Sequence, residues 1–460
     1  MHIPRTPSNT DLHKIIRENY RQVFFDKEND GTNLPFHLER EFRKYLNCGN
    51  LAYGMARFHC SVCQKDKLVA FSCKGRTLCP SCTGRRMAST AKHLVEEVIP
   101  EVPIRQWVLS MPYTHRFLLA TRPEYLRSVL AIYHRTLKTF YSKNAKAKNI
   151  SNPKVGAITV VQRFGGALNL NVHFHTLHTD GVFHKKENGE MTFLEIIPTD
   201  EDVKRLVGIL KRRINRALIR QENLAVADSA VESIQALSVQ NLDENFRLPI
   251  PIGKVDDPPF LDFSSSRCHY DDGFSLHAKV KIQGNEREAL ERLCRYVMRG
   301  PVAKERVQNS KDGSVLLKLK TPYLNGTTHL KFTPGQFIKR IISLIPPPRQ
   351  NLIRYVGVFG ARHKMRVEVT ALSRPLKKKL KLKKKVYSTP WAELLKHVFK
   401  YEVNYCDHCG GKLELIACIT STFVCKKILE HLKIKNEEVI VTSARAPPES
   451  NFLDQSCADL

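Results

Sequence analysis

Two pairs of cysteines near the start of the chain restrict the fold more than any other feature of the sequence. Cys60 and Cys63 form one Cys-x-x-Cys pair, and Cys79 and Cys82 form the next. A Cys-x-x-Cys turn directs both sulfurs to one point, and two such turns supply the four thiolates that close the tetrahedral coordination of zinc. The spacing therefore predicts one structural zinc site made of these four residues, in preference to buried cysteines that only pack.

Two more cysteines lie in the same region. Cys48 and Cys73 stand outside the Cys-x-x-Cys pairs, and His59 and His93 are candidate nitrogen ligands beside them. They either bind a second metal ion or pack as inert core residues.

Cys406 and Cys409 form another pair near the other end of the chain, where no partner pair is evident in the neighbouring sequence. A zinc site there would draw its remaining ligands from His397, His408 and Cys418.

The chain carries a large excess of positive charge. Its 460 residues include 74 Lys and Arg against 45 Asp and Glu, a formal net charge of +29. Such a surplus indicates a polyanionic partner, usually nucleic acid, with an anionic membrane surface as the alternative. No apolar run approaches the roughly 18 residues of a spanning helix, and the N-terminal segment lacks the apolar core of a signal peptide. We therefore expect a cytoplasmic protein that binds nucleic acid and no membrane.

Changes in composition divide the chain into four regions. We expect a helical, zinc-binding module over residues 1–100 and a larger domain over 101–305, with an insertion at about 185–270. A basic extension over 306–390 and a small module over 391–460 follow. The alternation of strand and helix patterns predicts an α+β protein.

His173 and His175 lie two residues apart in an apolar segment that predicts a strand. Paired glycines separate this segment from the preceding apolar one, which is typical of a β-hairpin. Residues two apart on a strand share a face, so the two imidazoles form one edge of a divalent-metal site. Exposed strand histidines without a ligand are an equally open alternative.

Tyr296 lies in a predicted helix between Arg295 and Arg299. Positive potential favours the phenolate and attracts a phosphodiester. A tyrosine acts as a covalent nucleophile where a metal or cation stabilises the developing charge. A half-buried tyrosine on an amphipathic helix is the commoner case, and composition alone does not single out one of the 14 tyrosines.

A run of almost uninterrupted positive charge covers Arg374–Lys385 and includes Lys377, Lys378 and Lys379. It predicts salt-dependent DNA binding without sequence preference, or a solvated linker.

Several long segments resemble, in order, the rolling-circle HUH transposases, and more closely the zinc-containing insertion-sequence transposases of the IS91 and common-region type. The segments are SCKGRTLCPSC (72–82), RQWVLSMP (105–112), VQRFGGALNLNVHFH (161–175), DGFSLHAKVKI (272–282), LERLCRYVMRGPVAKERV (290–307), RYVGVFGARHKMR (354–366) and WAELLKHVFKYEVNYCDHCGGKLELIACI (391–419).

The resemblance implies an HUH endonuclease domain, an antiparallel sheet flanked by helices, preceded by the zinc module. The positions that match the family's motifs are the zinc ligands Cys60, Cys63, Cys79 and Cys82, the ligands His173 and His175 of a catalytic Mg²⁺ or Mn²⁺, and the nucleophile Tyr296.

The third ligand of the catalytic metal stays open between Gln162, which we prefer, and His277. Some members of the family carry two tyrosines four positions apart, whereas Arg292 occupies the earlier position here. The chain therefore resembles the single-tyrosine form.

The activity implied is DNA transposition in a bacterial cell. The enzyme would nick single-stranded DNA at the element ends, hold a 5′-phosphotyrosine and rejoin the strands. A replication initiator with the same chemistry is one alternative, which the zinc module disfavours. A non-catalytic, zinc-dependent DNA-binding protein is the other, which intact His173, His175 and Tyr296 disfavour.

Overall fold

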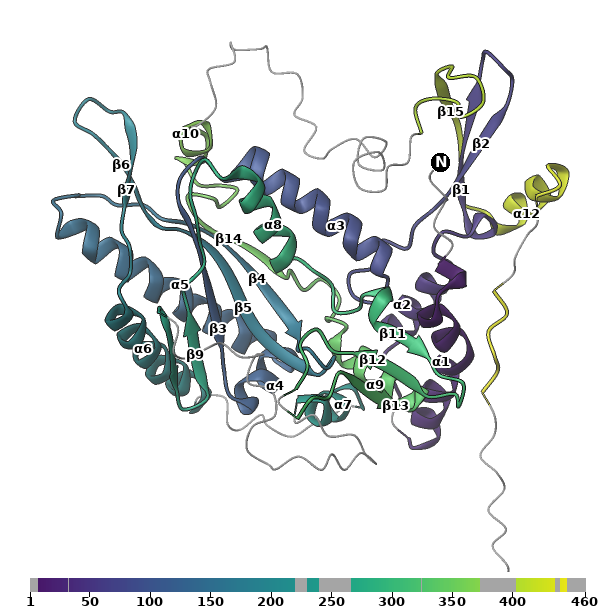
Figure 1. Ribbon diagram of the computed structural model, residues 1–460, viewed down its shortest axis with the longest axis horizontal. Helices are drawn as coiled ribbons and strands as arrows, with labels where there is room; N and C mark the ends of the chain where they lie inside the picture. Colours follow the sequence, from purple (N-terminus) through teal and green to yellow (C-terminus); the bar gives the residue numbers. More distant parts are fainter. Residues whose placement is uncertain are drawn as a thin grey trace, which may run out of the picture.

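The computed structural model describes the chain in seven stretches (Figure 1), which are residues 7–31, 33–219, 230–239, 266–323, 325–372, 403–434 and 439–444. Lys377, Lys378, Lys379 and His397 lie outside the described residues, as does much of the expected insertion at 185–270.

A seven-stranded antiparallel sheet forms the centre of the protein, with the order β14-β4-β5-β3-β9-β8 and β10 paired to β3. Its strands are β3 (Ile104–Ser110), β4 (Gly156–Phe164), β5 (Leu170–Thr179), β8 (Cys268–Asp271), β9 (Phe274–His277), β10 (Lys281–Ile282) and β14 (Ile353–Gly357). The predicted α+β class with an antiparallel sheet is confirmed.

The predicted hairpin is the β4–β5 pair. Gly165 N donates to the Asn169 carbonyl at 2.9 Å and closes the turn. A Cβ on Gly165 would lie 2.1 Å from the Asn169 side-chain oxygen, so this close approach favours glycine there. The register places Gln162 opposite His173 and Val160 opposite His175.

Helices cover both faces of this sheet, which is why β4 and β5 are apolar almost throughout. Phe174, Trp107 and Leu109 pack with α4 (Tyr113–Thr121), α5 (Pro123–Lys146) and α6 (Asp200–Ile219). The opposite face, with Val160 and Leu177, packs against α3 (Pro80–His93), the π-helix η3 (Leu94–Val98) and α8 (Arg287–Val297). Figure 1 shows α3 and α8 side by side over the sheet.

A helical layer adjoins one end of the sheet. It consists of α1 (Asp11–Asn29), α2 (Phe36–Leu46), α7 (Ala230–Val239), α9 (Pro334–Leu344) and a small sheet of β11 (Val307–Asn309), β12 (Val315–Lys318) and β13 (His329–Phe332). Thr10 caps α1 through His13 N, and Thr333 with Gln336 forms a capping box on α9. Tyr20 stacks on Phe42 with ring centroids 5.6 Å apart and joins α1 to α2.

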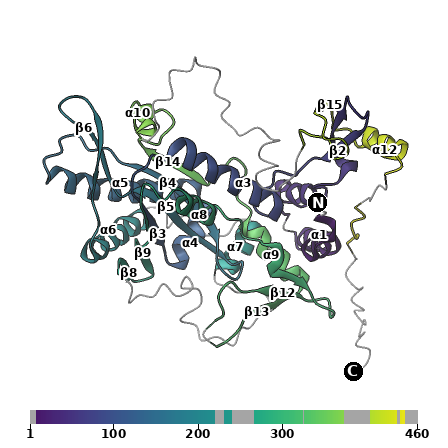
Figure 2. The same cartoon turned by 45° about the horizontal axis from the view of Figure 1, so that its top comes forward.

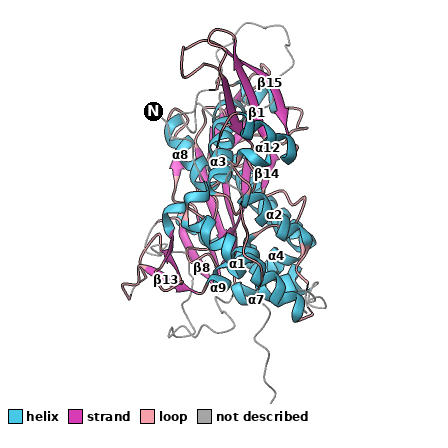
Figure 3. Ribbon diagram, turned by 90° about the vertical axis from the view of Figure 1, so that its right-hand side faces the viewer, coloured by secondary structure: helices cyan, strands magenta, loops and turns pink. Residues whose placement is uncertain are grey.

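A second small sheet joins the two ends of the chain. Strand β1 (Met55–Cys60) pairs on one side with β2 (Asp66–Ala70) and on the other with β15 (Leu413–Ile419). Figure 2 shows this sheet and α12 (Thr422–His431) at the opposite end of the molecule from β6 (Gly181–Lys185), which forms a hairpin with β7 (Met191–Glu195). Figure 3, in which the right-hand side of Figure 1 faces the viewer, shows β15 and β1 next to each other. 

Short elements complete the described chain: η1 (Pro7–Asn9), η2 (Leu51–Tyr53), η5 (Lys304–Arg306) and α10 (Arg366–Ala371). Among the described residues, no helix combines the length and the apolar character needed to cross a membrane.

Candidate active site and cysteine clusters

The two histidines lie together on β5, in the middle of the central sheet. The Nε2 atoms of His173 and His175 are 3.1 Å apart, so both nitrogens are directed to one point. His173 Nδ1 lies 2.9 Å from the Asn171 carbonyl, which only accepts, so Nδ1 carries the proton and the Nε2 lone pair is available. The Gln106 amide contacts His175 Nδ1 at 2.8 Å and orients that ring. The contacting atom is the amide nitrogen, which only donates, so His175 Nδ1 accepts and Nε2 carries the proton; exchange of the amide nitrogen and oxygen by a flip of Gln106 would free His175 Nε2 as a ligand.

Burial keeps both imidazoles neutral at pH 7. It lowers the pKa of His173 to about 4, and the charges of Arg116 and Arg299 act in the same direction. Burial also lowers the pKa of His175 well below its usual value. Neutral imidazole is the form that binds a metal ion, so the pair suits a divalent cation.

Tyr296 lies beside this pair, on α8. The helix buries Leu293 and Val297 against the sheet and leaves Tyr296 39% exposed. The ring centroids of Tyr296 and His175 are 5.9 Å apart and their planes are perpendicular at 87°. The tyrosine predicted from the sequence is therefore brought next to the predicted histidines.

Two cations lie over the Tyr296 ring. The Arg299 guanidinium is 4.5 Å from the ring centroid and Lys320 Nζ is 4.8 Å from it. Burial, together with Arg299 and Arg306, lowers the pKa of Lys320. Arg295, predicted beside Arg299 as a DNA contact, pairs with Glu291 on its own helix at 3.5 Å.

Gln162 and His277 occupy different places relative to the histidine pair. Gln162 lies directly opposite His173 on the neighbouring strand, with its Nε2 donating to the Val297 carbonyl at 2.7 Å. Its buried Oε1 has no hydrogen-bond partner among the described residues. Val108 on β3 is paired with His175 on one side and with His277 on the other. His277 is therefore two strands from β5, and its Cα lies roughly 10 Å from the Cα of His175. Gln162 is the better placed of the two.

The first cysteine cluster consists of Cys48, Cys73, Cys79 and Cys82. Cys82 Sγ lies 3.7 Å from Cys48 and 3.4 Å from Cys73, and Cys79 Sγ lies 3.7 Å from Cys48. Hydrogen bonding with Cys48 lowers the pKa of Cys82 and raises that of Cys79. Four thiolates this close need a cation between them.

The second cluster joins Cys60 and Cys63 to Cys406 and Cys409. Cys60 Sγ lies 3.4 Å from Cys409, and Cys63 Sγ lies 3.6 Å from Cys406. The backbone N–H groups of Cys409 and His408 lower the pKa of Cys406 to about 6. The N–H of Cys63 likewise lowers the pKa of Cys60.

Both clusters have the dimensions of a zinc–thiolate site. With Zn–S bonds of about 2.3 Å, the edge of a tetrahedron of sulfurs is about 3.8 Å, close to the separations observed. In each cluster the four sulfurs all lie within 4.8 Å of one another.

The predicted zinc site of Cys60, Cys63, Cys79 and Cys82 is therefore wrong in its grouping. Cys60 and Cys63 lie at the tip of the β1–β2 hairpin, whereas Cys79 and Cys82 begin α3 near the base of that hairpin. Strands of six and five residues separate tip and base by roughly 15–20 Å. The sequence left open whether Cys48 and Cys73 bind a metal ion or only pack. In the structure they lie in one cluster with Cys79 and Cys82. Neither His59 nor Cys418 belongs to a cluster among the described residues.

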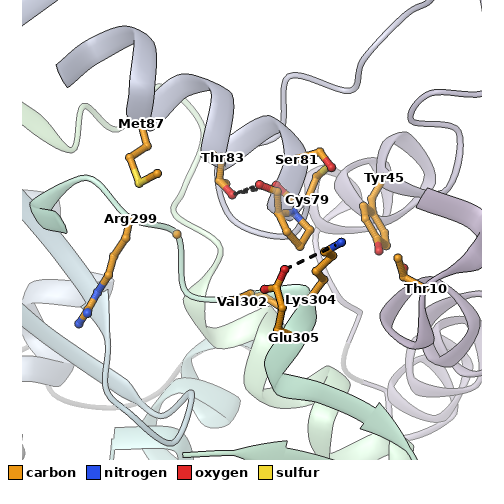
Figure 4. Close-up of a pocket in the computed structure, with 14 residues that line it drawn as sticks. Thr10, Tyr45, Cys79, Ser81, Thr83, Met87, Arg299, Val302, Lys304 and Glu305 are labelled. Atoms are coloured by element: carbon orange, nitrogen blue, oxygen red, sulfur yellow. Dashed lines mark hydrogen bonds and ion pairs between the residues drawn. The ribbon is translucent and has the colours of Figure 1, made fainter. Parts of the chain in front are cut away.

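The first cluster borders the loop that follows the tyrosine helix. A cavity of about 350 Å³ lies between them, lined by Cys79, Thr83 and Met87 on one side and by Val302 and Lys304 on the other. Figure 4 shows the Arg299 side chain directed away from Cys79. Gly300 packs so closely on α3 that a Cβ there would lie 2.9 Å from Thr83 Oγ1. The first turn of α3, which carries Cys82 and Thr83, thus contacts the segment that carries Arg299.

Known families match the two parts of this arrangement. The family of transposase zinc-binding domains, Zn_Tnp_IS91, matches residues 15–111, and the transposase family Y2_Tnp matches residues 156–366. These two matches identify a transposase, a protein that acts on DNA. The chain belongs to the IS91-type transposases with an N-terminal zinc-binding domain, and the cysteine clusters are consistent with structural zinc. No curated protein and no solved structure matches the chain.

Proposed function

We propose that this transposase nicks and rejoins single-stranded DNA through a covalent bond to Tyr296. The observation that carries the proposal is the position of the half-exposed Tyr296 ring, 5.9 Å from the ring of His175 and under the cations of Arg299 and Lys320. In the reaction Tyr296 Oη attacks the scissile phosphorus, the P–O3′ bond breaks, and a 5′-phosphotyrosine and a free 3′-hydroxyl result. Attack by another 3′-hydroxyl reverses the step, so no nucleotide cofactor is consumed.

Three side chains would hold the catalytic cation. His173 Nε2, His175 Nε2 and Gln162 Oε1 are the ligands we assign, because the imidazoles are neutral and Oε1 is buried with no partner in the part of the chain that the structure describes. Bound Mg²⁺ or Mn²⁺ would polarise the scissile phosphate. Oxygen and imidazole ligands suit Mn²⁺ well.

The remaining residues act on the phosphate and the phenol. Arg299 and Lys320 attract the phosphodiester and stabilise the negative charge that develops on Tyr296 Oη. Arg295, Lys377, Lys378 and Lys379 stay predicted contacts to the DNA backbone, and the bacterial cytoplasm is where such an enzyme would meet its substrate.

Covalent capture tests the proposal. The protein is incubated with Mn²⁺ and single-stranded oligonucleotides that include the flanks of its own gene, then denatured, digested and analysed by mass spectrometry. We expect a nucleotide adduct on Tyr296 that is lost with EDTA, in His173→Ala and in Tyr296→Phe. Tyr270→Phe is the matched control, because Tyr270 is similarly exposed at 46% but lies on the edge strand β8. An adduct on another tyrosine, or tight binding without any adduct, would refute the assignment.

A further inference from the structure

The second cysteine cluster connects parts of the chain that are far apart in sequence. Cys63 and Cys406 are separated by 343 positions, and Cys60 and Cys409 by 349. The zinc-binding family match ends at residue 111, so it covers only half of these ligands. This cluster therefore extends beyond the zinc-binding domain as that family defines it.

We propose that Zn²⁺ bound by Cys60, Cys63, Cys406 and Cys409 fastens residues 403–434 to the β1–β2 hairpin, and that this C-terminal segment keeps its fold and position only while the ion is bound. The proposal concerns the assembly of the chain and does not depend on the tyrosine chemistry.

The cluster has the form of a complete zinc site. Each half is a Cys-x-x-Cys turn, closed by hydrogen bonds from Gln64 N to the Cys60 carbonyl at 2.8 Å and from Gly410 N to the Cys406 carbonyl at 2.9 Å. The sulfur contacts of 3.4 and 3.6 Å run between the two turns and not within one. Four thiolates close the coordination sphere, so the ion is structural.

Among the described residues, the other contacts that hold the C-terminal segment to the hairpin are a strand pairing, two small apolar clusters and an ion pair. Strand β15 pairs with β1 over six positions, with a register shift between Arg57 and Phe58. Two small apolar clusters connect the segment to the hairpin, one around Met55 and Leu429 and one around Phe58 and Leu413. An ion pair between Lys67 Nζ and Asp407 Oδ2 at 2.7 Å is largely exposed on the Asp407 side.

The segment itself has little core. Leu415, Ile416 and Phe423 are more than half exposed, and only a few of its apolar side chains are buried. Chains of this length rarely fold on apolar burial alone and commonly depend on a metal, which binds the folded state and not the unfolded one. The ion therefore supplies the stability that the apolar contacts lack.

The zinc content of the full-length protein is the first measurement. We expect two zinc ions per chain, and one in the double variant Cys406→Ser, Cys409→Ser. Cys418→Ser is the matched control, because Cys418 is an exposed cysteine on the adjoining strand outside the cluster, and it should retain two. A wild-type protein with one zinc and two disulfides between the cysteine pairs would overturn the proposal.

A cleavable connection tests the fastening directly. A site-specific protease sequence is inserted into the full chain between Leu372 and Val403, and the cut protein is passed over a sizing column. We expect the C-terminal fragment to co-elute in the wild type and in Cys418→Ser, and to separate in the double variant or after chelation. Co-elution of the fragment in a double variant that holds a single zinc would show that the ion does not fasten the segment.

Discussion

Gln162 on β4 faces His173 on β5 and at the same time donates a 2.7 Å hydrogen bond to the Val297 carbonyl, one residue after Tyr296. A carbonyl can only accept, so the amide nitrogen is held at α8 and the oxygen is left over. One side chain thus connects the histidine strand to the tyrosine helix and presents a buried oxygen that has no hydrogen-bond partner within the described ranges.

Two substitutions of Gln162 separate these roles. Gln162→Glu keeps an oxygen ligand but cannot donate to Val297, whereas Gln162→Met keeps the length and loses both functions. We expect Gln162→Met to lower the nicking rate roughly 10–100-fold and to raise the Mn²⁺ concentration at half-maximal rate. Gln162→Glu should keep that Mn²⁺ concentration near the wild-type value. Equal Mn²⁺ dependence in both variants and the wild type would contradict metal binding by Oε1.

Gly300 packs the segment that carries Arg299 against Thr83 on α3, the helix that also carries Cys82. A Cβ at residue 300 would lie 2.9–3.2 Å from the Thr83 side chain, so Gly300→Ala should push the loop off α3 and lower nicking without loss of zinc. Adding Thr83→Ala removes the contacts with Oγ1 and Cγ2 and leaves only the one with Cβ at 3.0 Å, so it should restore part of the rate. Gly84→Ala is the control, because no atom lies within 4 Å of its Cβ position. Failure of Thr83→Ala to restore any activity would refute the steric explanation.

A buried ion pair joins the start of β3 to the residue that follows β5. Arg105 and Asp180 are 1% and 0% exposed and form two hydrogen bonds at 2.8 and 2.6 Å. Asp180→Ala leaves a buried, unpaired guanidinium and should lower the free energy of unfolding by about 3–5 kcal/mol in urea denaturation. Glu190→Gln, which removes the exposed partner of Lys186, should cause no measurable change. A similar small effect for both would show that Arg105 finds another partner.

His178 makes stability depend on pH. Burial lowers its folded-state pKa to about 4, and its ring stacks on Tyr141 at 4.4 Å. The unfolded chain therefore takes up a proton near the ordinary pKa of about 6.5 while the folded chain does not. Stability from this group is complete above pH 6.5 and declines as the pH falls towards 4.

The comparison with His178→Phe isolates this contribution. The phenyl ring retains the stacking but cannot titrate, so the free energy of unfolding should fall less between pH 7 and pH 5 than in the wild type. Loss of zinc at low pH affects both proteins alike, so the difference between the two slopes is the quantity to measure. Identical slopes would contradict a titrating His178.

Much of the candidate active site follows from local patterns. A spacing of two on a strand predicts that His173 and His175 share a face, and the Gly165-Gly166 turn predicts that β4 returns beside them with Gln162. The structure agrees on both. The sequence did not predict that Lys320 and Gln106 belong to the site, because no local pattern around either residue indicates which side chains it will contact. Lys320 reaches Tyr296 only through the folding of the segment after β12 onto α8.

The grouping of the cysteines into two clusters could not be predicted from local sequence patterns. Three Cys-x-x-Cys pairs are visible in the sequence, and each is a turn that directs two sulfurs to one point, because that geometry needs only four consecutive residues. Which pairs share an ion is a long-range property. It follows from the length of the β1–β2 hairpin, which carries Cys60 and Cys63 away from α3, and from the pairing of β15 with β1, which brings Cys406 and Cys409 to them. Proximity in the sequence favours Cys79 and Cys82 as partners of Cys60 and Cys63. A zinc ion, however, binds the cysteines that are closest in space, and those are determined by the pairing of the strands.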